Sequence, residues 1–242
     1  MRGVLVGCDR SQEWLLSWWW DNYRQKNTLP VAFADFGMSG AGRTWCEERG
    51  CLLPILIDGY KVAVKEEIDP FLLKEWEHSI SPFWDSREVW FKKPFALLHA
   101  PFLQTLWMDL DCEVLDNVES AYEYIDPICK MGLARVRDPE NEEAVPYNSG
   151  VIVFEKDSPI LEKWAETSFS QNHKFLGDQD VLSHIIFKEG YTVGEVPQIY
   201  NWLMFRGVHV GAKILHWAAV WGKEYIKKHG GLRNALNSMR VK

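Results

Sequence analysis

The stretch LQTLWMDLDC, residues 103–112, joins an apolar segment to two carboxylates. The run from Leu103 to Met108 is apolar enough for a buried central strand, which is expected to stop at Asp109. If the chain stays extended there, Asp109 and Asp111 point to one side, about 7 Å apart, while Leu110 faces the core. In open α/β sheets, ligands bind at the carboxyl ends of the strands. The stretch therefore predicts a central strand with a ligand site at its end.

Segments on both sides of this stretch alternate between short apolar runs and amphipathic segments. That alternation is typical of an α/β fold with a mostly parallel, twisted sheet. The expected strands cover residues 4–6, 31–33, 103–108 and 151–154, with a further apolar run at 52–57. The expected helices cover residues 12–23, 86–99 and 178–188, and another opens at 157–159. Because no repeat or Pro/Gly-rich linker interrupts the pattern, residues 1–242 are expected to form a single domain.

The composition is that of an ordinary globular enzyme, with 242 residues, 47% of them hydrophobic and a formal net charge of -7. The negative charge argues against nucleic acid as the main partner, because such a partner needs a basic surface. The five cysteines are odd in number and lack a Cys-x-x-Cys pair, which favours a reducing compartment and no structural zinc. The apolar run Gly3–Cys8 is too short for a signal peptide or a membrane span, so a cytoplasmic location is expected.

The C-terminal tail, residues 223–242, has a strongly basic character in this acidic chain. Its only acid is Glu224, against six lysines and arginines. One interpretation is a solvated C-terminal helix. The other is a patch that contacts anionic lipid or an acidic acceptor, which would place the protein peripherally at a membrane.

Asp109 and Asp111 are candidate metal ligands. Two hard oxygen ligands at a strand end suit Mn²⁺ or Mg²⁺, which would bridge them to a diphosphate. Solvated acids at a strand end are the alternative. His216 lies in the apolar segment Ile214–Trp217, where a lone histidine is usually a hydrogen-bonded core residue unless a metal lies nearby.

Two further polar segments precede expected regular elements. Asn148-Ser149-Gly150 leads into the strand at 151–154 and is expected to form a small turn. Asp178 stands at the start of the helix 178–188, where it could cap the first turn. Each segment by itself has this ordinary structural interpretation.

Taken together, these motifs resemble the GT-A glycosyltransferases of the family that includes glycogenin and the bacterial lipopolysaccharide galactosyl- and glucosyltransferases. The resemblance covers nearly the whole chain, and the motifs follow the order of that family. They are Val6–Asp9, Lys93 within Trp90–Pro94, Asp109-x-Asp111, Asn148–Gly150, Asp178–Asp180 and His216.

The resemblance implies a Rossmann-like GT-A domain that transfers a hexose from a nucleoside-diphosphate sugar, by default UDP-linked, to an acceptor. It implies Mn²⁺ or Mg²⁺ held by Asp109, Asp111 and His216. The donor-binding residues it implies are Gly7, Cys8 and Asp9 at the base and ribose, then Lys93, Asp109, Asn148, Ser149 and Gly150. Asp178 would hold a sugar hydroxyl, and Gln179 would lie beside the anomeric carbon.

Retention of anomeric configuration is the expected outcome, because the amide of Gln179 is not a base. Asp178 or Asp180 remains an alternative nucleophile for a two-step route to the same outcome. The family usually follows its metal histidine with a glycine and a lysine that clasps the diphosphate. Here Trp217 follows His216 and the first lysine is Lys223, so the resemblance leaves the role of Lys223 open.

Three other functions remain as alternatives. In a haloacid-dehalogenase-type phosphatase, Asp109 would be the nucleophile, but that residue normally ends the first strand. In a sugar nucleotidyltransferase, the Gly-rich segment Gly40–Thr44 would cradle phosphates, but such a loop normally follows the first strand directly. A carbohydrate-binding protein would use exposed tryptophans alone. The acceptor, whether carbohydrate, lipid-linked or protein, is not identified; residues 36–42 and 200–207 are candidate acceptor loops.

Overall fold

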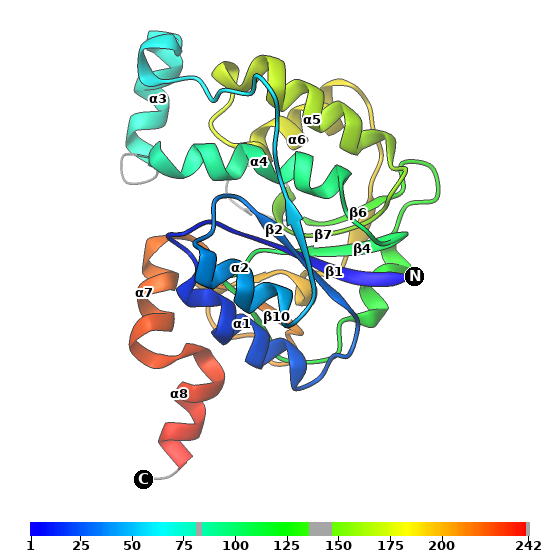
Figure 1. The fold of residues 1–242 in the computed structure, drawn as a ribbon, viewed down its shortest axis with the longest axis vertical. Helices are drawn as coiled ribbons and strands as arrows, with labels where there is room; N and C mark the ends of the chain where they lie inside the picture. Colours follow the sequence, from blue (N-terminus) through cyan, green and yellow to red (C-terminus); the bar gives the residue numbers. More distant parts are fainter. Residues whose placement is uncertain (81–83, 136–146, 241–242) are drawn as a thin grey trace.

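The computed structural model describes residues 1–80, 84–135 and 147–240 and is built on a seven-stranded sheet (Figure 1). The strand order is β3-β2-β1-β4-β7-β6-β8. β7 is antiparallel to both of its neighbours, while the other strand pairs are parallel, so the expected mostly parallel sheet is confirmed. The strands are β1 (Arg2–Cys8), β2 (Val31–Asp35), β3 (Cys51–Pro54), β4 (Gln104–Met108), β6 (Met131–Arg135), β7 (Tyr147–Glu155) and β8 (Gly194–Val196).

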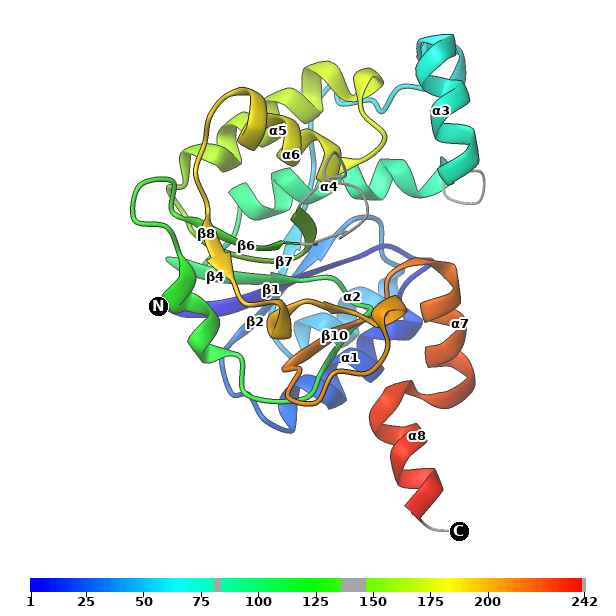
Figure 2. The same cartoon turned by 180° about the vertical axis from the view of Figure 1, so that it is seen from behind.

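Helices cover both faces of this sheet (Figures 1 and 2). One face carries α1 (Trp14–Arg24) and α2 (Gly40–Glu47), and the other carries α4 (Arg87–Leu98), α5 (Pro159–Gln171) and α6 (Asp178–Lys188). α3 (Pro70–Ile80) lies beside the start of α4. Successive side chains of the central strands point to opposite faces of the sheet, so each face has its own hydrophobic core. Val4 and Leu106 pack on the α1 side, and Leu5 and Trp107 pack on the α4 side.

A second, three-stranded sheet lies on the α1 side and has the order β5-β10-β9. Its strands are β5 (Cys112–Val114), β9 (Trp202–Leu203) and β10 (Ile214–His216). β5 follows β4 after a tight turn, and its Cys112 pairs with His216 of β10. This pairing brings the end of the chain back to the carboxyl edge of the central sheet.

Two helices end the described chain, α7 (Ala219–His229) and α8 (Gly231–Arg240). Both views show α8 projecting from the body of the molecule (Figures 1 and 2). Residues 241 and 242 of the basic tail lie outside the described residues. Short 3-10 helices occupy Lys65–Glu67, Trp84–Ser86, Glu119–Tyr124, Asn172–Lys174, Gln198–Tyr200 and Met204–Arg206.

The expected strands and helices are confirmed, with two corrections to expected loops. Residues Asn148–Gly150 do not form a separate turn but belong to β7, at the place where its pairing with β6 shifts register between Leu133 and Arg135. The Gly-rich segment from Gly40 is not a phosphate-cradling loop but the start of α2, because the Ser39 hydroxyl accepts a hydrogen bond from the Gly42 N–H (3.1 Å) and caps the helix.

All five cysteines are free thiols. Among the residues described, the helices are all too short or too polar to cross a bilayer.

Candidate active site

The two carboxylates of the Asp-x-Asp motif follow β4 in a turn, not in the extended conformation expected from the sequence. The N–H of Asp109 donates to the carbonyl of Gly150 on β7 (2.8 Å), and the N–H of Cys112 donates back to the carbonyl of Asp109 (3.1 Å). The chain turns here because β5 must leave the central sheet to pair with β10. Leu110 is buried, as expected.

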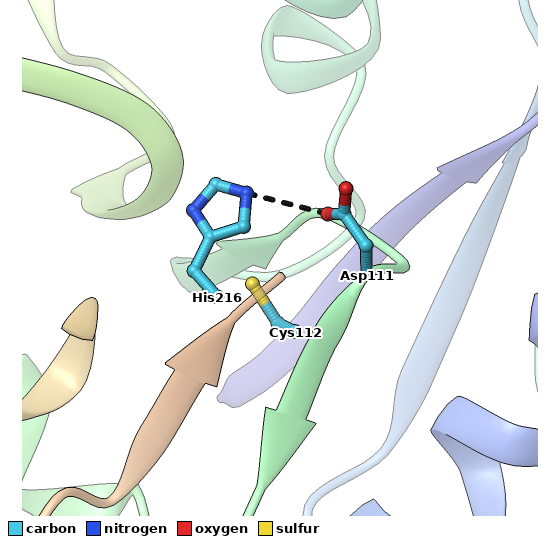
Figure 3. Close-up of side chains that lie close together, drawn as sticks. All are labelled: Asp111, Cys112 and His216. Carbon is cyan, nitrogen blue, oxygen red and sulfur yellow. Dashed lines mark ion pairs between the residues drawn. The ribbon is translucent and has the colours of Figure 1, made fainter. Parts of the chain in front are cut away.

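His216 faces both carboxylates across this turn. Its Nε2 lies 3.3 Å from Oδ1 of Asp111 and 3.9 Å from Oδ2 of Asp109. Figure 3 shows the imidazole of His216 and the carboxylate of Asp111 turned toward each other, with Cys112 beside them. The three residues that the sequence predicts as metal ligands therefore meet at one point.

These side chains fit a divalent cation. Oδ1 of Asp111 is buried and has no hydrogen-bond partner, which is costly unless something else occupies that acceptor. Burial would raise the pKa of Asp111, but the ammonium of Lys223 outweighs burial and holds the pKa below its usual range, so the group is an anion. Two carboxylate oxygens and an imidazole nitrogen suit Mn²⁺ or Mg²⁺.

Cys112 also borders this point, and its thiol lies within 4.8 Å of ligand atoms of Asp111 and His216. Burial raises the pKa of the Cys112 thiol well above its usual range. A protonated thiol is a poor metal ligand, because the thiolate is the form that binds. The carboxylates of Asp111 and Asp109 and the imidazole of His216 are therefore the groups at this point that could hold a cation.

Lys93, on α4, places a positive charge between the carboxylates of Asp109 and Asp178. Its Nζ lies 3.2 Å from Oδ1 of Asp109, 3.2 Å from Oδ2 of Asp178 and 3.1 Å from Oγ of Ser149. Burial would lower the pKa of Lys93, but Asp109 and Asp178 outweigh burial and hold the pKa above its usual range. The lysine stays charged in a buried position.

The start of α6 supplies Asp178 and Gln179. Asp178 is buried, accepts a hydrogen bond from the Ser149 hydroxyl (2.9 Å), and has its pKa raised by burial. The expectation that Asp178 caps this helix is wrong: the carboxylate of Asp180 accepts the hydrogen bond of the Gly177 N–H (2.9 Å). Asp178 is thereby left to face Lys93.

Asn148 and Gly150 of β7 complete the centre. The side chain of Asn148 donates to Oε1 of Gln179 (2.9 Å). A Cβ atom on Gly150 would lie 2.2 Å from Cε1 of His216, so only glycine leaves room for the imidazole. Sequence reasoning assigned Gly150 to the donor, whereas its clearest structural role is to seat His216.

Gly7, Cys8 and Asp9 stand at the carboxyl end of β1, the neighbour of β4. A Cβ atom on Gly7 would lie 2.2 Å from the ring of Phe36, and the thiol of Cys8 is buried in the core. The carboxylate of Asp9 accepts from the Gln12 N–H (3.0 Å) and the Ser11 hydroxyl (2.9 Å). The groups of this segment that could contact a ligand are therefore its backbone and the carboxylate of Asp9.

Three site residues were not assigned from the sequence. Nζ of Lys223, on α7, lies 2.5 Å from Oδ2 of Asp111. Nε1 of Trp107 donates to Asp109 (2.8 Å), and Asn201 contacts Nδ1 of His216 (2.9 Å). For Lys223, the sequence showed only that the first lysine after His216 comes later than in the family it resembles. An isolated tryptophan or asparagine belongs to no motif, so Trp107 and Asn201 could not be predicted.

With this geometry in place, comparison with known proteins identifies the class of fold. No known family model matches the sequence, and no curated protein matches it significantly. Solved structures do match the fold. Galactosyltransferase LgtC, solved in complex with donor and acceptor sugar analogs, is 14% identical with a TM-score of 0.59, and the match covers 94% of each chain.

Two more glycosyltransferases show the same architecture. Mouse xyloside xylosyltransferase 1 is 14% identical over 89% of this chain and 97% of its own, with a TM-score of 0.59. The glycosyltransferase GlyE of Streptococcus pneumoniae TIGR4 is 15% identical with a TM-score of 0.60, over 90% of this chain but 54% of its own. The chain therefore has the GT-A glycosyltransferase fold, as the resemblance in its motifs implied.

Proposed function

We propose that this protein is a metal-dependent glycosyltransferase that moves a hexose from a nucleoside-diphosphate sugar, by default a UDP sugar, to an acceptor. The observation that carries the proposal is the convergence of Asp109, Asp111 and His216 at the carboxyl edge of a GT-A sheet. The solved neighbours include a galactosyltransferase and a xylosyltransferase, which act on sugars.

A divalent cation, when bound, stabilises the negative charge that grows on the departing nucleoside diphosphate. The chain's own residues would supply the rest. Lys93 is a buried, charged donor that can turn from Asp178 toward a phosphate or sugar oxygen. Asp178 would accept hydrogen bonds from sugar hydroxyls. On a protein of net charge -7, such local cations are needed to attract an anionic donor.

Thermal denaturation with a panel of nucleotides, with and without Mn²⁺, tests the proposal. A ligand that binds the folded state raises the midpoint by mass action, and the nucleotide with the largest shift names the donor class. We expect a shift with a nucleoside diphosphate only when Mn²⁺ is present. Full transfer activity after chelation, or no nucleotide-dependent shift at all, would refute the proposal.

Retention is supported by the residues around Gln179. Oε1 of Gln179 accepts from Asn148 (2.9 Å) and from the Ser149 N–H (3.1 Å), and its amide is no base. Asp178 is engaged by Lys93 and Ser149. One solved neighbour is an active-site glutamine-to-glutamate mutant of LgtC, so that enzyme has a glutamine in its active site.

In such a reaction the departing phosphate oxygen would take the acceptor's proton on the same face of the sugar. Gln179→Ala is expected to lower turnover more than donor binding, while Asp178→Asn disturbs both. Proton NMR of the product from an α-linked donor decides the stereochemistry. A β-linked product refutes retention and directs attention to the acidic residues as bases.

Contact with an anionic membrane surface is proposed for the C-terminal helices. The last turn of α7 carries Lys227, Lys228 and His229, and α8 projects from the body (Figures 1 and 2). Substitution of both Lys227 and Lys228 by glutamine is expected to reduce sedimentation with anionic vesicles at low salt while nucleotide binding persists. If the intact protein does not sediment with such vesicles, these helices do not bind an anionic membrane. A cytoplasmic location stays a prediction.

A further inference from the structure

A chain of side-chain amides connects the imidazole of the metal centre to Gln179. Nδ1 of His216 lies 2.9 Å from Oδ1 of Asn201. Nδ2 of Asn201 donates to Oδ1 of Asn148 (2.9 Å), and Nδ2 of Asn148 donates to Oε1 of Gln179 (2.9 Å). The four residues come from β10, the segment before β9, β7 and α6, so only the folded chain assembles them.

Two backbone N–H groups fix the direction of every bond in this chain. The Gly150 N–H donates to Oδ1 of Asn148 (2.9 Å), and the Ser149 N–H donates to Oε1 of Gln179 (3.1 Å). A backbone N–H can only donate, so both of these atoms must be oxygens and neither amide can be turned around.

The orientation of the Asn201 amide follows in the same way. Because Oδ1 of Asn148 is an acceptor, the atom of Asn201 that faces it must be the NH₂ group. The oxygen of Asn201 then faces His216, and Nδ1 of His216 must carry a proton. Nε2, the nitrogen that faces Asp109 and Asp111, is the one left to bind a cation.

We propose that Asn201 is a positioning residue that presents Nε2 of His216 to the metal and ties the metal centre to Gln179 through Asn148. This inference rests on the proposed function. Asn201 and His216 are 4% and 3% exposed, so water cannot readily replace these hydrogen bonds. The chain also holds Oε1 of Gln179 between Asn148 and the Ser149 N–H, so the NH₂ group is the part of this amide that the chain does not use.

Two substitutions at Asn201 separate its two contacts. Asn201→Asp keeps an acceptor for the Nδ1 proton of His216 but loses the donor to Asn148. Asn201→Leu, of similar size, loses both. Asn148→Asp keeps the contacts to Gly150 and Asn201 but loses the donor to Gln179. Asn27→Leu is the matched control, because Asn27 is a buried asparagine whose bonds run to Tyr23, Asp116 and Val118, away from the site.

The first readout is nitrogen NMR of ¹⁵N-histidine-labelled, metal-free protein at alkaline pH. In the wild type, Asn201→Asp and Asn27→Leu, we expect His216 to show a protonated Nδ1 and an unprotonated Nε2. In Asn201→Leu we expect a mixture of the two tautomers. The second readout is Mn²⁺ affinity by titration calorimetry, which should fall about 10 to 100-fold in Asn201→Leu and persist in Asn201→Asp.

The third readout is steady-state kinetics, in which Asn201→Asp and Asn148→Asp should lower kcat more than they raise the donor KM. A wild-type His216 protonated at Nε2 overturns the proposal, as does an Asn201→Leu variant with unchanged tautomer and Mn²⁺ affinity. The NMR result needs no donor or metal, so it stands even if nucleotide binding fails and the proposed function with it.

Discussion

Nζ of Lys93 lies 3.2 Å from the carboxylate of Asp178, and both side chains are almost fully buried. The pair joins α4 to the start of α6, and the same ammonium also reaches Asp109 after β4. One buried cation thus holds together the elements that carry the proposed metal ligands and the proposed sugar-binding residues. We therefore expect donor binding and fold stability to depend on the same contact.

Lys93→Met is expected to destabilise the protein by about 3–5 kcal/mol, because it leaves Asp178 buried without its cation. Urea denaturation measures the loss. Lys93→Met combined with Asp178→Asn removes both charges and should recover most of the stability, though not donor binding. If the single substitution Lys93→Met leaves the protein as stable as the wild type, this ion pair does not stabilise the fold.

Asp111→Asn and Asp109→Asn are each expected to abolish the Mn²⁺-dependent thermal shift produced by the nucleoside diphosphate. His216→Ala should weaken Mn²⁺ affinity about 10 to 100-fold, if loss of a ligand resembles loss of its supporting partner. Asp116→Asn, at an exposed position further along the chain, is the control and should behave as the wild type. A persistent Mn²⁺ response in both aspartate variants contradicts the assigned ligand set.

Lys223→Met is expected to strengthen binding of Mn²⁺ in the absence of nucleotide. A cation bound at Oδ1 of Asp111 would share that carboxylate with a competing charge, the ammonium of Lys223, which lies 2.5 Å from Oδ2. Removing that competitor should raise affinity about tenfold, or about 1.4 kcal/mol. Lys227→Met, on the same helix and paired with Glu224, is the control for loss of charge. Equal Mn²⁺ affinity in the wild type and Lys223→Met would mean that the ion pair does not compete.

Gly150→Ala is expected to displace the imidazole of His216, since the new Cβ would lie 2.2 Å from Cε1. Overpacking of this kind typically costs about 1–3 kcal/mol. Mn²⁺ affinity should fall as well, which titration calorimetry would show. Gly40→Ala is the control, because no atom lies within 4 Å of a Cβ built at Gly40. Unchanged Mn²⁺ affinity in Gly150→Ala would show that the ring has room to move.

Asp180→Asn is expected to stabilise the protein at neutral pH by about 3 kcal/mol, because each unit of raised pKa corresponds to about 1.4 kcal/mol. Burial raises the pKa of Asp180 to about 6, above its value in the unfolded chain. As pH rises from about 4 to 6, the unfolded chain loses this proton first, so the carboxyl group lowers stability over that window. The amide oxygen of the substituted side chain can still accept from the Gly177 N–H. Urea denaturation should show equal stabilities below pH 4; a gap present at every pH contradicts the titration.

Much of this fold could be predicted from local pattern. Strand and helix periods are properties of neighbouring residues, so β4 and α6 were recognisable from the apolar run before Asp109 and from the segment after Gly177. Asp109 and Asp111 were identifiable as a pair because hard oxygen ligands spaced two residues apart at a strand end are a local feature.

Other features were not encoded locally. The turn at Asp109, the place of Asn148 inside β7 and the cap supplied by Asp180 depend on pairings between distant segments. The turn exists because Cys112 must pair with His216, and only the assembled small sheet shows this. Strand pairing couples residues without regard to their separation in sequence, so these outcomes were decided by packing.

The amino-acid sequence alone determined the α/β fold class and the carboxylate pair Asp109 and Asp111, because both follow from residue type and spacing. The role of His216 as a ligand was implied by the family resemblance. The tertiary structure alone decided which nitrogen of His216 faces the carboxylates and that Lys223 pairs with Asp111. Only the folded chain brings Asn201 to His216, because hydrogen-bond direction and charge pairing are properties of atoms in contact and not of their order along the chain.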